Sequence, residues 1–448
     1  MRQETAPARW SADQVLALAP DPAAARAGQA LGTPRPWRDT GQSGDPPLIW
    51  GSCRGTSRVP YDVCVDVGGP AYRCSCPSYK NPCKHALGLL LLWTAGHVAE
   101  QAEPAVPEWA RQWRQEREAR RERAAGRAAR RSDSEAAART RQRRAARVEA
   151  GIDELDRWLN DQVRQGLAGA ARAGYQHWDA MAARLVDAQA PGLASSVRRL
   201  AGVASAPDRL LTELSLLRLV VTGYRRRDSL PDDLAATVRS RVGFPTSTED
   251  VLAGAPVTDE WSVVGIRDEM EERFNLRRAW LHGTATGRDA LILTFAPPGT
   301  ALPGDLVLGT QFEGDVCFYP GRGNLRALVK CRHSPPKTFP DPPGAAPTIQ
   351  EALHRYAEAV AADPWLERWP MLVTGVTVVP APLAESGEAQ PWHILDSAGD
   401  ALPLNRWAPA PWRLLAAAGG GPVTLFGEWG TEGLRPLAMW ADGRLVRP

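Results

Sequence analysis

The chain has 448 residues, more than a single hydrophobic core covers, so its length predicts about two to four domains. Its 44% apolar and 23% charged residues are typical of a globular protein in water. The longest strongly apolar run, residues 86–95, is shorter than the roughly 18 to 20 residues that a membrane span needs. The first residues include no apolar segment of signal-peptide length, and we therefore expect a cytoplasmic protein.

The formal net charge of +3 conceals one strongly basic segment. Residues 111–147, called the basic segment below, contain fourteen arginines and five acidic residues, a local charge of +9, so the other residues sum to −6. The chain contains only four lysines, and this bias toward arginine, with abundant Ala, Gly and Pro, is typical of a bacterial protein from a GC-rich genome. The position of the arginines is therefore more informative than their number.

The first hundred residues predict a helix, a loop, two strands and a buried helix. Residues 12–18 are helical in pattern, and a Gly- and Pro-rich stretch through Pro47 predicts a loop. Residues 61–67 alternate between apolar and polar, the period of a half-buried strand. Gly68-Gly69 predicts a hairpin turn into a second strand at 71–74, and residues 86–93 are apolar on every side, which predicts a buried helix.

The middle of the chain is helical in pattern. Residues 107–148 are rich in Ala and Arg and lack an apolar face apart from Trp113, which predicts one long helix. An apolar stripe with helical spacing follows at Leu155, Leu159, Val163 and Leu167. Further helices are predicted at 178–186, 191–200, 207–220 and 232–242.

From about Pro256 short β-type runs separated by Pro and Gly replace the helical pattern. Thr348 and Glu351 have the spacing of a capping box and predict one helix among the strands. Asp268 and Glu269 stand at the start of an apparent second helix. The predicted strands are 278–281, 291–295, 316–319, 325–329, 371–379 and 423–429.

These patterns predict an α+β multidomain protein with an N-terminal ββα zinc finger. The expected order is a zinc-finger domain (1–100), a basic Ala/Arg-rich helical linker (101–150), a helical domain (151–250) and a β-rich C-terminal domain (251–448).

Seven cysteines without a secretory signal argue against a disulfide framework. Cys74, Cys76, Cys83 and His85 follow the order C-x-C-x6-C-x-H. Three thiolates and one imidazole are donors that zinc prefers, and four protein ligands close a tetrahedron, so the site is predicted to be structural. We interpret Cys53 and Cys64 as free thiols, with a role as alternative ligands left open.

This ligand pattern resembles the SWIM zinc finger, whose signature is C-x-C followed by C-x-H on a ββα unit. All four signature positions are filled here, and the specific part of the match covers about residues 50 to 95. The resemblance implies zinc binding by a module that occurs in helicase-, transposase- and recombination-associated proteins, where it serves DNA or protein interaction. The rest of the chain more loosely resembles bacterial SWIM proteins of similar length, which implies a MoxR-like AAA ATPase or a von Willebrand A-type protein as a partner.

Arginines recur every three or four residues along the predicted 107–148 helix and line one face of it. Such a face can neutralise several phosphates in a sequence-independent way. The alternative is a solvated connecting helix with Arg–Glu pairs through Glu116, Glu118 and Glu122. The residues predicted to contact DNA or RNA are Arg73, Lys80, Lys84, Arg114, Arg117, Arg120, Arg123 and Arg127.

Cys331 and His333 repeat the C-x-H spacing downstream of Cys317, and we interpret these three residues as incidental. The sequence contains no phosphate loop, no G-x-S-x-G elbow and no H-E-x-x-H motif, so no enzyme and no small-molecule substrate are predicted. The favoured hypothesis is a nucleic-acid-binding adaptor, followed by a protein-interaction scaffold that recruits its partner through the C-terminal half. An enzyme in the C-terminal half ranks last.

Overall fold

The computed structural model describes most of the chain, and the account below concerns only these residues. Among the helices of the described residues, none combines the length and apolar character needed to cross a membrane. The predicted turn at Gly68-Gly69 lies outside the described residues. The described residues are 10, 12–44, 48–55, 59–67, 71–78, 80–101, 106–117, 119, 135–172, 174–270, 274–298, 300, 302–339, 341–344, 347–380, 392–408, 411–441 and 443–447.

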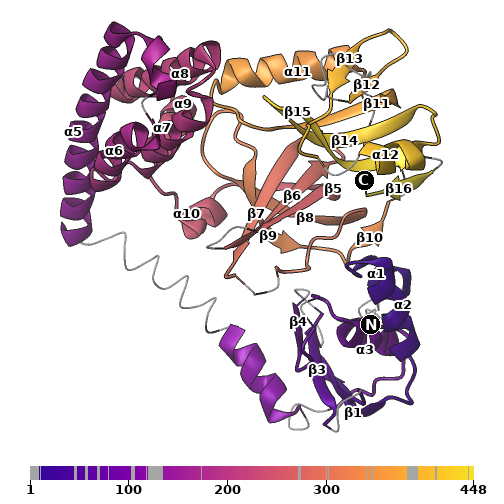
Figure 1. The fold of residues 1–448 in the computed structure, drawn as a ribbon. Helices are drawn as coiled ribbons and strands as arrows, with labels where there is room; N and C mark the ends of the chain where they lie inside the picture. Colours follow the sequence, from indigo (N-terminus) through magenta and orange to yellow (C-terminus); the bar gives the residue numbers. More distant parts are fainter. Residues whose placement is uncertain are drawn as a thin grey trace.

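The N-terminal domain, residues 10–101, is a four-stranded antiparallel sheet packed against helices (Figure 1). The strand order is β1-β2-β3-β4, so the two predicted strands, β3 and β4, belong to a larger sheet. The buried helix predicted at 86–93 is α3, and all of those residues are buried in it. The elements are α1 (Ala12–Ala17), α2 (Pro22–Leu31), β1 (Trp37–Ser43), β2 (Leu48–Cys53), β3 (Tyr61–Asp66), β4 (Ala71–Cys74) and α3 (Lys84–Thr94).

The loop predicted through Pro47 is wrong, because α2 and β1 lie within it. Asp21 caps α2 by accepting a hydrogen bond from the backbone N–H of Ala24, with a proline in the first turn. Trp37 begins β1 and is buried in the core beneath α3. The cap of α2 and the start of β1 each involve only a few residues, and the many Gly and Pro residues around them indicated a loop instead.

Both faces of the N-terminal sheet are covered. One face packs against α3 through Ile49, Val63 and Val65, while Cys64 points to the opposite face, as the alternation of β3 predicts. Helical residues 108–117 cover that second face through Ala110 and Trp113. The start of the basic segment is therefore packed against this domain. Trp113 was the only apolar contact predicted for this helix, but Ala110 and Trp109 belong to the same contact.

A helical bundle follows, with one continuous core. Its first helix, α5, crosses residue 150, where the sequence pattern suggested a boundary. Arg144 donates to the carbonyl oxygen of Gly243 at 3.1 Å and stacks on Phe244, so it ties α5 to the far end of the bundle. The elements are α5 (Glu135–Gln165), η2 (Leu167–Arg172), α6 (Gly174–Asp187), α7 (Pro191–Val203), α8 (Pro207–Arg225), η3 (Arg227–Ser229) and α9 (Asp232–Val242), followed by α10 (Thr248–Ala253).

The C-terminal half contains two six-stranded sheets. The first has the order β10-β8-β5-β6-β7-β9, with β8 also pairing with β9. Its strands are β5 (Val257–Met270), β6 (Asn275–Gly283), β7 (Asp289–Ala296), β8 (Thr310–Phe318), β9 (Arg326–Arg332) and β10 (Lys337–Thr338).

The second sheet has the order β13-β12-β11-β14-β15-β16, and α11 packs on it behind the predicted capping box of Thr348 and Glu351. A shared core that includes Trp280 and Phe426 joins the two sheets. The elements are α11 (Ile349–Ala362), β11 (Trp369–Val379), β12 (His393–Leu395), β13 (Ala401–Pro403), α12 (Pro411–Ala418), β14 (Val423–Gly430), β15 (Gly433–Ala441) and β16 (Arg444–Val446).

The helix that Asp268 and Glu269 seemed to open is wrong, because both residues lie near the end of the 14-residue strand β5. Asp268 lies directly opposite Arg277 on β6 and pairs with it, while Glu269 lies opposite Leu276 and pairs diagonally with Arg278. Opposite charges placed directly across two antiparallel strands stabilise the pairing. The acidic pair therefore serves the sheet and has no helix dipole to neutralise.

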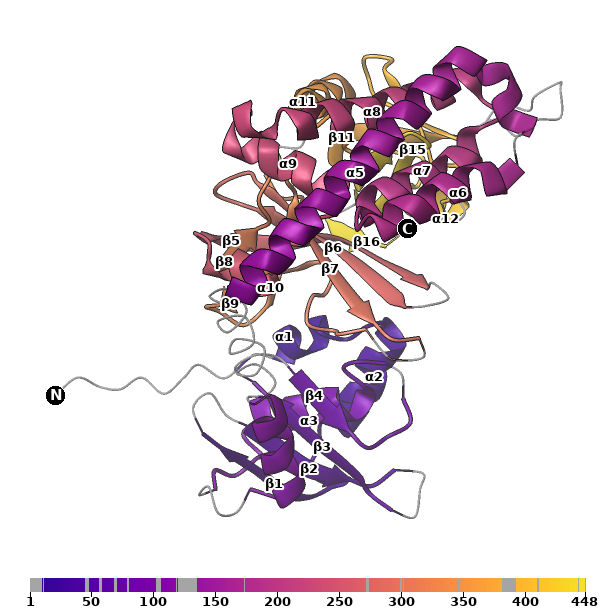
Figure 2. The same ribbon diagram turned by 90° about the vertical axis from the view of Figure 1, so that its left-hand side faces the viewer.

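The N-terminal domain and the helical bundle lie on different sides of the β structure (Figures 1 and 2). Val307 of the first sheet's domain packs against the N-terminal core, and α1 contacts β10. Gly304 lies so close to the carbonyl oxygen of Asn81 that a Cβ would collide with it. The N-terminal domain is therefore docked directly on the C-terminal half.

One buried carboxylate fixes the turn between β6 and β7. Asp259 is 5% exposed and accepts hydrogen bonds from the backbone N–H groups of Glu260, Ala285 and Thr286 and from the Thr286 hydroxyl. Burial alone raises the pKa of Asp259, but these hydrogen bonds outweigh it and the net pKa is lowered.

We predict that Asp259→Asn lowers the free energy of unfolding by about 1 to 3 kcal/mol, because an amide NH2 would face N–H donors. Asp228→Asn, at a side chain that is 92% exposed, is the control and should leave stability unchanged. Because the folded pKa is lowered, the contribution of Asp259 is present above its unfolded pKa and disappears as pH falls through the folded pKa. Denaturant midpoints at neutral and acidic pH measure both effects, and equal midpoints for the two variants at neutral pH would contradict the prediction.

Candidate metal centre

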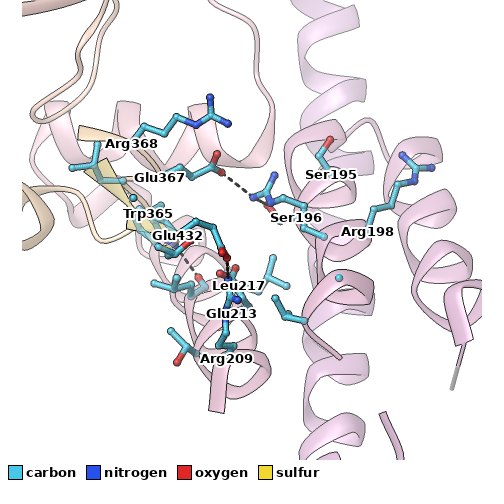
Figure 3. Close-up of a pocket in the computed structure, with 18 of the residues that line it drawn as sticks. Ser195, Ser196, Arg198, Arg209, Glu213, Leu217, Trp365, Glu367, Arg368 and Glu432 are labelled. Carbon is cyan, nitrogen blue, oxygen red and sulfur yellow. Dashed lines mark hydrogen bonds and ion pairs between the residues drawn. The ribbon is translucent and has the colours of Figure 1, made fainter. Parts of the chain in front are cut away.

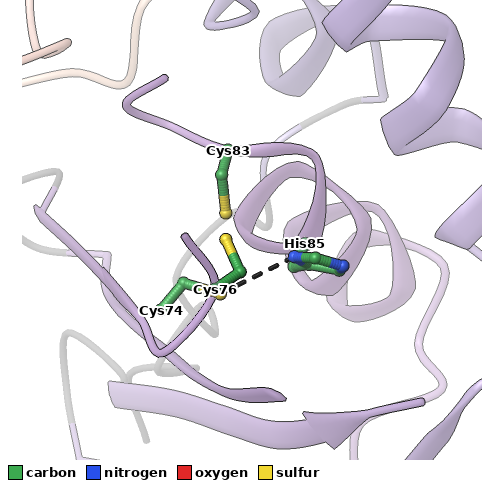
Figure 4. A group of neighbouring side chains, drawn as sticks. All are labelled: Cys74, Cys76, Cys83 and His85. Carbon is green, nitrogen blue, oxygen red and sulfur yellow. Dashed lines mark hydrogen bonds between the residues drawn. The ribbon is translucent and has the colours of Figure 1, made fainter. Parts of the chain in front are cut away.

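Four side chains converge where β4 ends and α3 begins. Cys74 is the last residue of β4, Cys76 follows it, Cys83 is the N-cap residue of α3, and His85 lies in the first turn of that helix. Their donor atoms all lie within 4.8 Å of one another, and Cys74 Sγ is 3.7 Å from His85 Nδ1 (Figure 4). This Cys3His cluster has the composition and compactness of a closed tetrahedral metal site.

The thiols of the cluster influence one another's ionisation. The pKa of the Cys83 thiol is lowered to about 4, first by the Cys74 thiol and then, against the effect of burial, by His85 and the backbone N–H of Ala86 at the start of α3. Cys83 and burial in turn raise the pKa of Cys74. Since neighbouring thiolates repel each other, the three sulfurs are all ionised together only around a cation.

The aromatic ring of Tyr61 fixes the orientation of the His85 imidazole. His85 is 4% exposed, and its ring centroid lies 4.9 Å from that of Tyr61 on β3. Packing of this kind limits the rotation of a ligand ring and keeps Nδ1 directed at the sulfurs. Tyr61 was not among the predicted site residues, because nothing in the sequence distinguishes it beyond its place at the start of a strand.

The two remaining N-terminal cysteines lie outside the cluster. Cys53 is buried in the core beneath α3, and burial raises the pKa of its thiol to about 11. Cys64 is buried on the opposite face of the sheet, and burial raises its pKa to about 12. Both are free cysteines, as predicted, and neither groups with the four donors.

The comparisons with family models identify this segment and one other. Residues 63–93 match the SWIM zinc finger, and these residues include β3 from Val63 on, β4, the whole Cys3His cluster and all but the last residue of α3. The chain contains a SWIM zinc finger. Residues 143–242 match the SWIM-associated four-helix bundle domain, which spans most of α5 and continues to the end of α9. Neither the curated proteins nor the solved structures gave a match.

Five of the eight cations predicted to contact nucleic acid lie within the described residues, on the N-terminal domain or on the helix packed against it. Lys80 pairs with Asp21 at 2.6 Å, and Lys84 is exposed at the first position of α3. Arg73 is exposed on β4 and donates to the carbonyl oxygen of Trp109 at 3.5 Å. Arg120, Arg123 and Arg127 lie outside the described residues.

Arg114 and Arg117 lie on helical residues 108–117, against the N-terminal sheet. Arg117 Nη1 is 2.6 Å from Asp66 Oδ2 at the end of β3, and its guanidinium also stacks on Trp113. A paired and half-buried arginine mainly anchors the helix. Arg117, one of the residues predicted to contact nucleic acid, therefore has a structural role.

A cavity of about 1300 Å3, which no sequence pattern predicted, lies between the helical bundle and the second sheet. Figure 3 shows Ser195 and Ser196 of α7 on its helical side, and Trp365, Glu367 and Arg368 on its other side. Its lining contains seven arginines and four glutamates, an excess of positive charge. Residues more than 200 positions apart in sequence form the walls, so no local pattern could have revealed it.

We predict that Cys83→Ala releases the metal ion and unfolds the N-terminal domain, because metal binding supplies on the order of 10 to 16 kcal/mol in small metal-dependent domains. Cys64→Ala is the matched control: it removes a buried thiol outside the cluster, so metal content should be unchanged. Metal content per chain, together with hydrogen exchange of β2, β3 and α3, measures both effects. An unaltered metal content in Cys83→Ala would refute the ligand assignment.

Proposed function

We propose that the chain is a non-enzymatic, zinc-binding interaction protein whose SWIM finger and basic segment together contact nucleic acid. The observation that supports this proposal is the packing of residues 108–117 on the sheet that contains β3 and β4. This packing places the beginning of the basic segment beside the finger. A single surface can then present cations from both.

Zinc is the metal that best fits the donor set. Three thiolates and an imidazole suit zinc, and four protein ligands leave no open position for a bound water. The metal in this role stabilises the fold of the finger and takes no part in chemistry. Calcium and magnesium are disfavoured because they prefer oxygen ligands.

The charge of the basic segment supports nucleic acid as the partner. Five acidic residues cannot neutralise fourteen arginines, so the segment keeps a formal charge of +9. A duplex carries one phosphate charge per roughly 1.7 Å of helix axis, so an elongated run of arginines can contact several phosphates. Such binding depends strongly on salt and weakly on sequence.

We predict that the zinc-loaded full-length protein binds labelled single- and double-stranded DNA or RNA with an affinity that falls steeply as salt increases. Replacing Arg120, Arg123 and Arg127 by Gln should weaken binding by a similar factor on all sequences. Each lost phosphate contact should reduce the slope of log K against log salt by about 0.7 to 0.9. Fluorescence anisotropy across a salt series measures both quantities.

The matched control replaces three exposed arginines of the bundle, Arg157, Arg164 and Arg172, by Gln, which changes the net charge equally. It should leave the salt slope unchanged. If both triple variants changed the salt slope equally, binding would depend on the net charge of the protein and not on the basic segment. Absence of binding at low salt would remove nucleic acid from the proposed function.

A second candidate function is a protein-interaction scaffold that recruits its partner through the C-terminal half. The cavity favours this candidate, because Arg267, Arg368 and Arg435 of its lining share Glu428. Arg278 and Glu269 lie beside them, outside the lining, and add one further charge of each sign. Burial, followed by the neighbouring Arg267, lowers the pKa of Arg435, whose described hydrogen bond goes to the neutral Asn405. An acidic segment of a partner protein, such as the AAA ATPase or von Willebrand A-type protein suggested by the family resemblance, would supply the missing negative charge.

We predict that a labelled poly-glutamate peptide binds the full-length protein and that Arg435→Gln weakens binding about tenfold, since a hydrogen bond to a charged group contributes about 1.5 to 3 kcal/mol. Arg413→Gln, an exposed arginine of α12 outside the cavity lining, changes the net charge equally and should have no effect. Equal affinities for the wild type and both variants would remove the cavity from the scaffold hypothesis.

A further inference from the structure

The strands β8 and β9 bring a second group of potential metal ligands together. Asp315 on β8 and Cys331 on β9 are direct partners in the antiparallel register, and His333 follows the end of β9. The sequence pattern led us to interpret Cys317, Cys331 and His333 as incidental. Cys317 does lie apart, because it is buried and its thiol faces the carbonyl oxygen of Gly254, but Asp315 joins Cys331 and His333.

The thiol, the imidazole and the two carboxylate oxygens lie at the separations of ligands that share one ion. Cys331 Sγ is 3.1 Å from Asp315 Oδ2 and 3.8 Å from His333 Nε2, and His333 Nε2 is 3.2 Å from Asp315 Oδ1. The sulfur–nitrogen separation nearly equals the 3.7 Å between Cys74 and His85 in the SWIM finger. Metal–ligand bonds of about 2.0 to 2.3 Å place tetrahedral ligands at such separations from one another.

Neighbouring groups hold these donors in place. The Thr258 hydroxyl donates to Asp315 Oδ1 at 2.6 Å, which fixes the carboxylate. The backbone N–H of His333 donates to the carbonyl oxygen of Glu313 at 2.7 Å, and the Ser334 hydroxyl accepts from the N–H of Glu313. Oriented ligands with supporting hydrogen bonds are a recurrent feature of metal sites.

The arrangement does not fit nucleophilic catalysis by a Cys-His-Asp triad. In a triad the base uses one ring nitrogen for the nucleophile and the other for the carboxylate that orients it. Here both Cys331 and Asp315 lie at the same nitrogen, Nε2 of His333. Convergence of sulfur, nitrogen and oxygen on one point is instead the geometry of a shared cation.

We propose that Asp315, Cys331 and His333 bind a second transition-metal ion of the zinc class, separate from that of the SWIM finger. Cys331 is exposed and the His333 side chain is 42% exposed, so the ion would face solvent on one side. Three protein ligands leave a fourth position open for water or for a donor group from a partner. The site would therefore be accessible, unlike the buried Cys3His cluster.

The test is the metal content of the full-length protein. After loading with Zn2+ and removal of loosely bound metal, mass spectrometry should give two ions per chain for the wild type. His333→Ala and Cys331→Ala should each give one ion, with the thermal unfolding midpoint close to that of the wild type, since both side chains lie at the surface. Cys83→Ala should lose the other ion, so the two sites are counted independently.

Two further variants separate a built site from casual binding. His354→Ala removes an imidazole that is 76% exposed and should retain both ions. Thr258→Val leaves the three ligands intact and should weaken the second site about 10- to 100-fold, as loss of a supporting hydrogen bond does in metal sites. One ion per wild-type chain, or two ions in His333→Ala, would overturn the proposal, and an undiminished affinity in Thr258→Val would equally contradict a built site.

Discussion

Three sulfur atoms and one imidazole nitrogen meet where β4 gives way to α3, and the N-terminal domain depends on that junction. The thiols compete for protons, so the pKa of Cys83 falls while that of Cys74 rises. A bound cation removes this competition and joins the end of a strand to the start of the buried helix. Since α3 is buried along almost its whole length, its position determines the core in which β1, β2 and β3 pack.

The sheet placed by this junction positions the basic segment. Its second face, around Trp50 and Cys64, receives residues 108–117, and Arg117 closes the contact through Asp66. An arginine-rich helix without an apolar stripe has little reason to dock on its own. Here Ala110, Trp109 and Trp113 supply the apolar contact that holds residues 108–117 on the sheet. This arrangement is what makes joint binding by the finger and the basic segment physically reasonable.

In the C-terminal half, the ratio of arginines to carboxylates differs from place to place. Where the two are matched across strands, as at Asp268 and Arg277, they stabilise the sheet. Around Glu269 and Glu428 the arginines outnumber the carboxylates, and burial lowers the pKa of Arg278 and Arg435. The role of a carboxylate in this half of the molecule therefore depends on how many arginines surround it and on how deeply those arginines are buried.

Features set by neighbours in the chain could be inferred from the sequence alone. The Cys-x-Cys and Cys-x-His spacing, the capping box at Thr348 and the helix over Asp232–Val242 depend on residues a few positions apart, whose geometry the backbone fixes. Only the tertiary structure decided which distant residues meet. Asp315 rather than Cys317 joins Cys331 because strand register and a bulge after Asp315 align them. Arg144 connects α5 to the end of α9 through Gly243, and the cavity lies between α7, α8 and β14. Both features depend on how distant elements pack together, and no pattern of neighbouring residues encodes that packing.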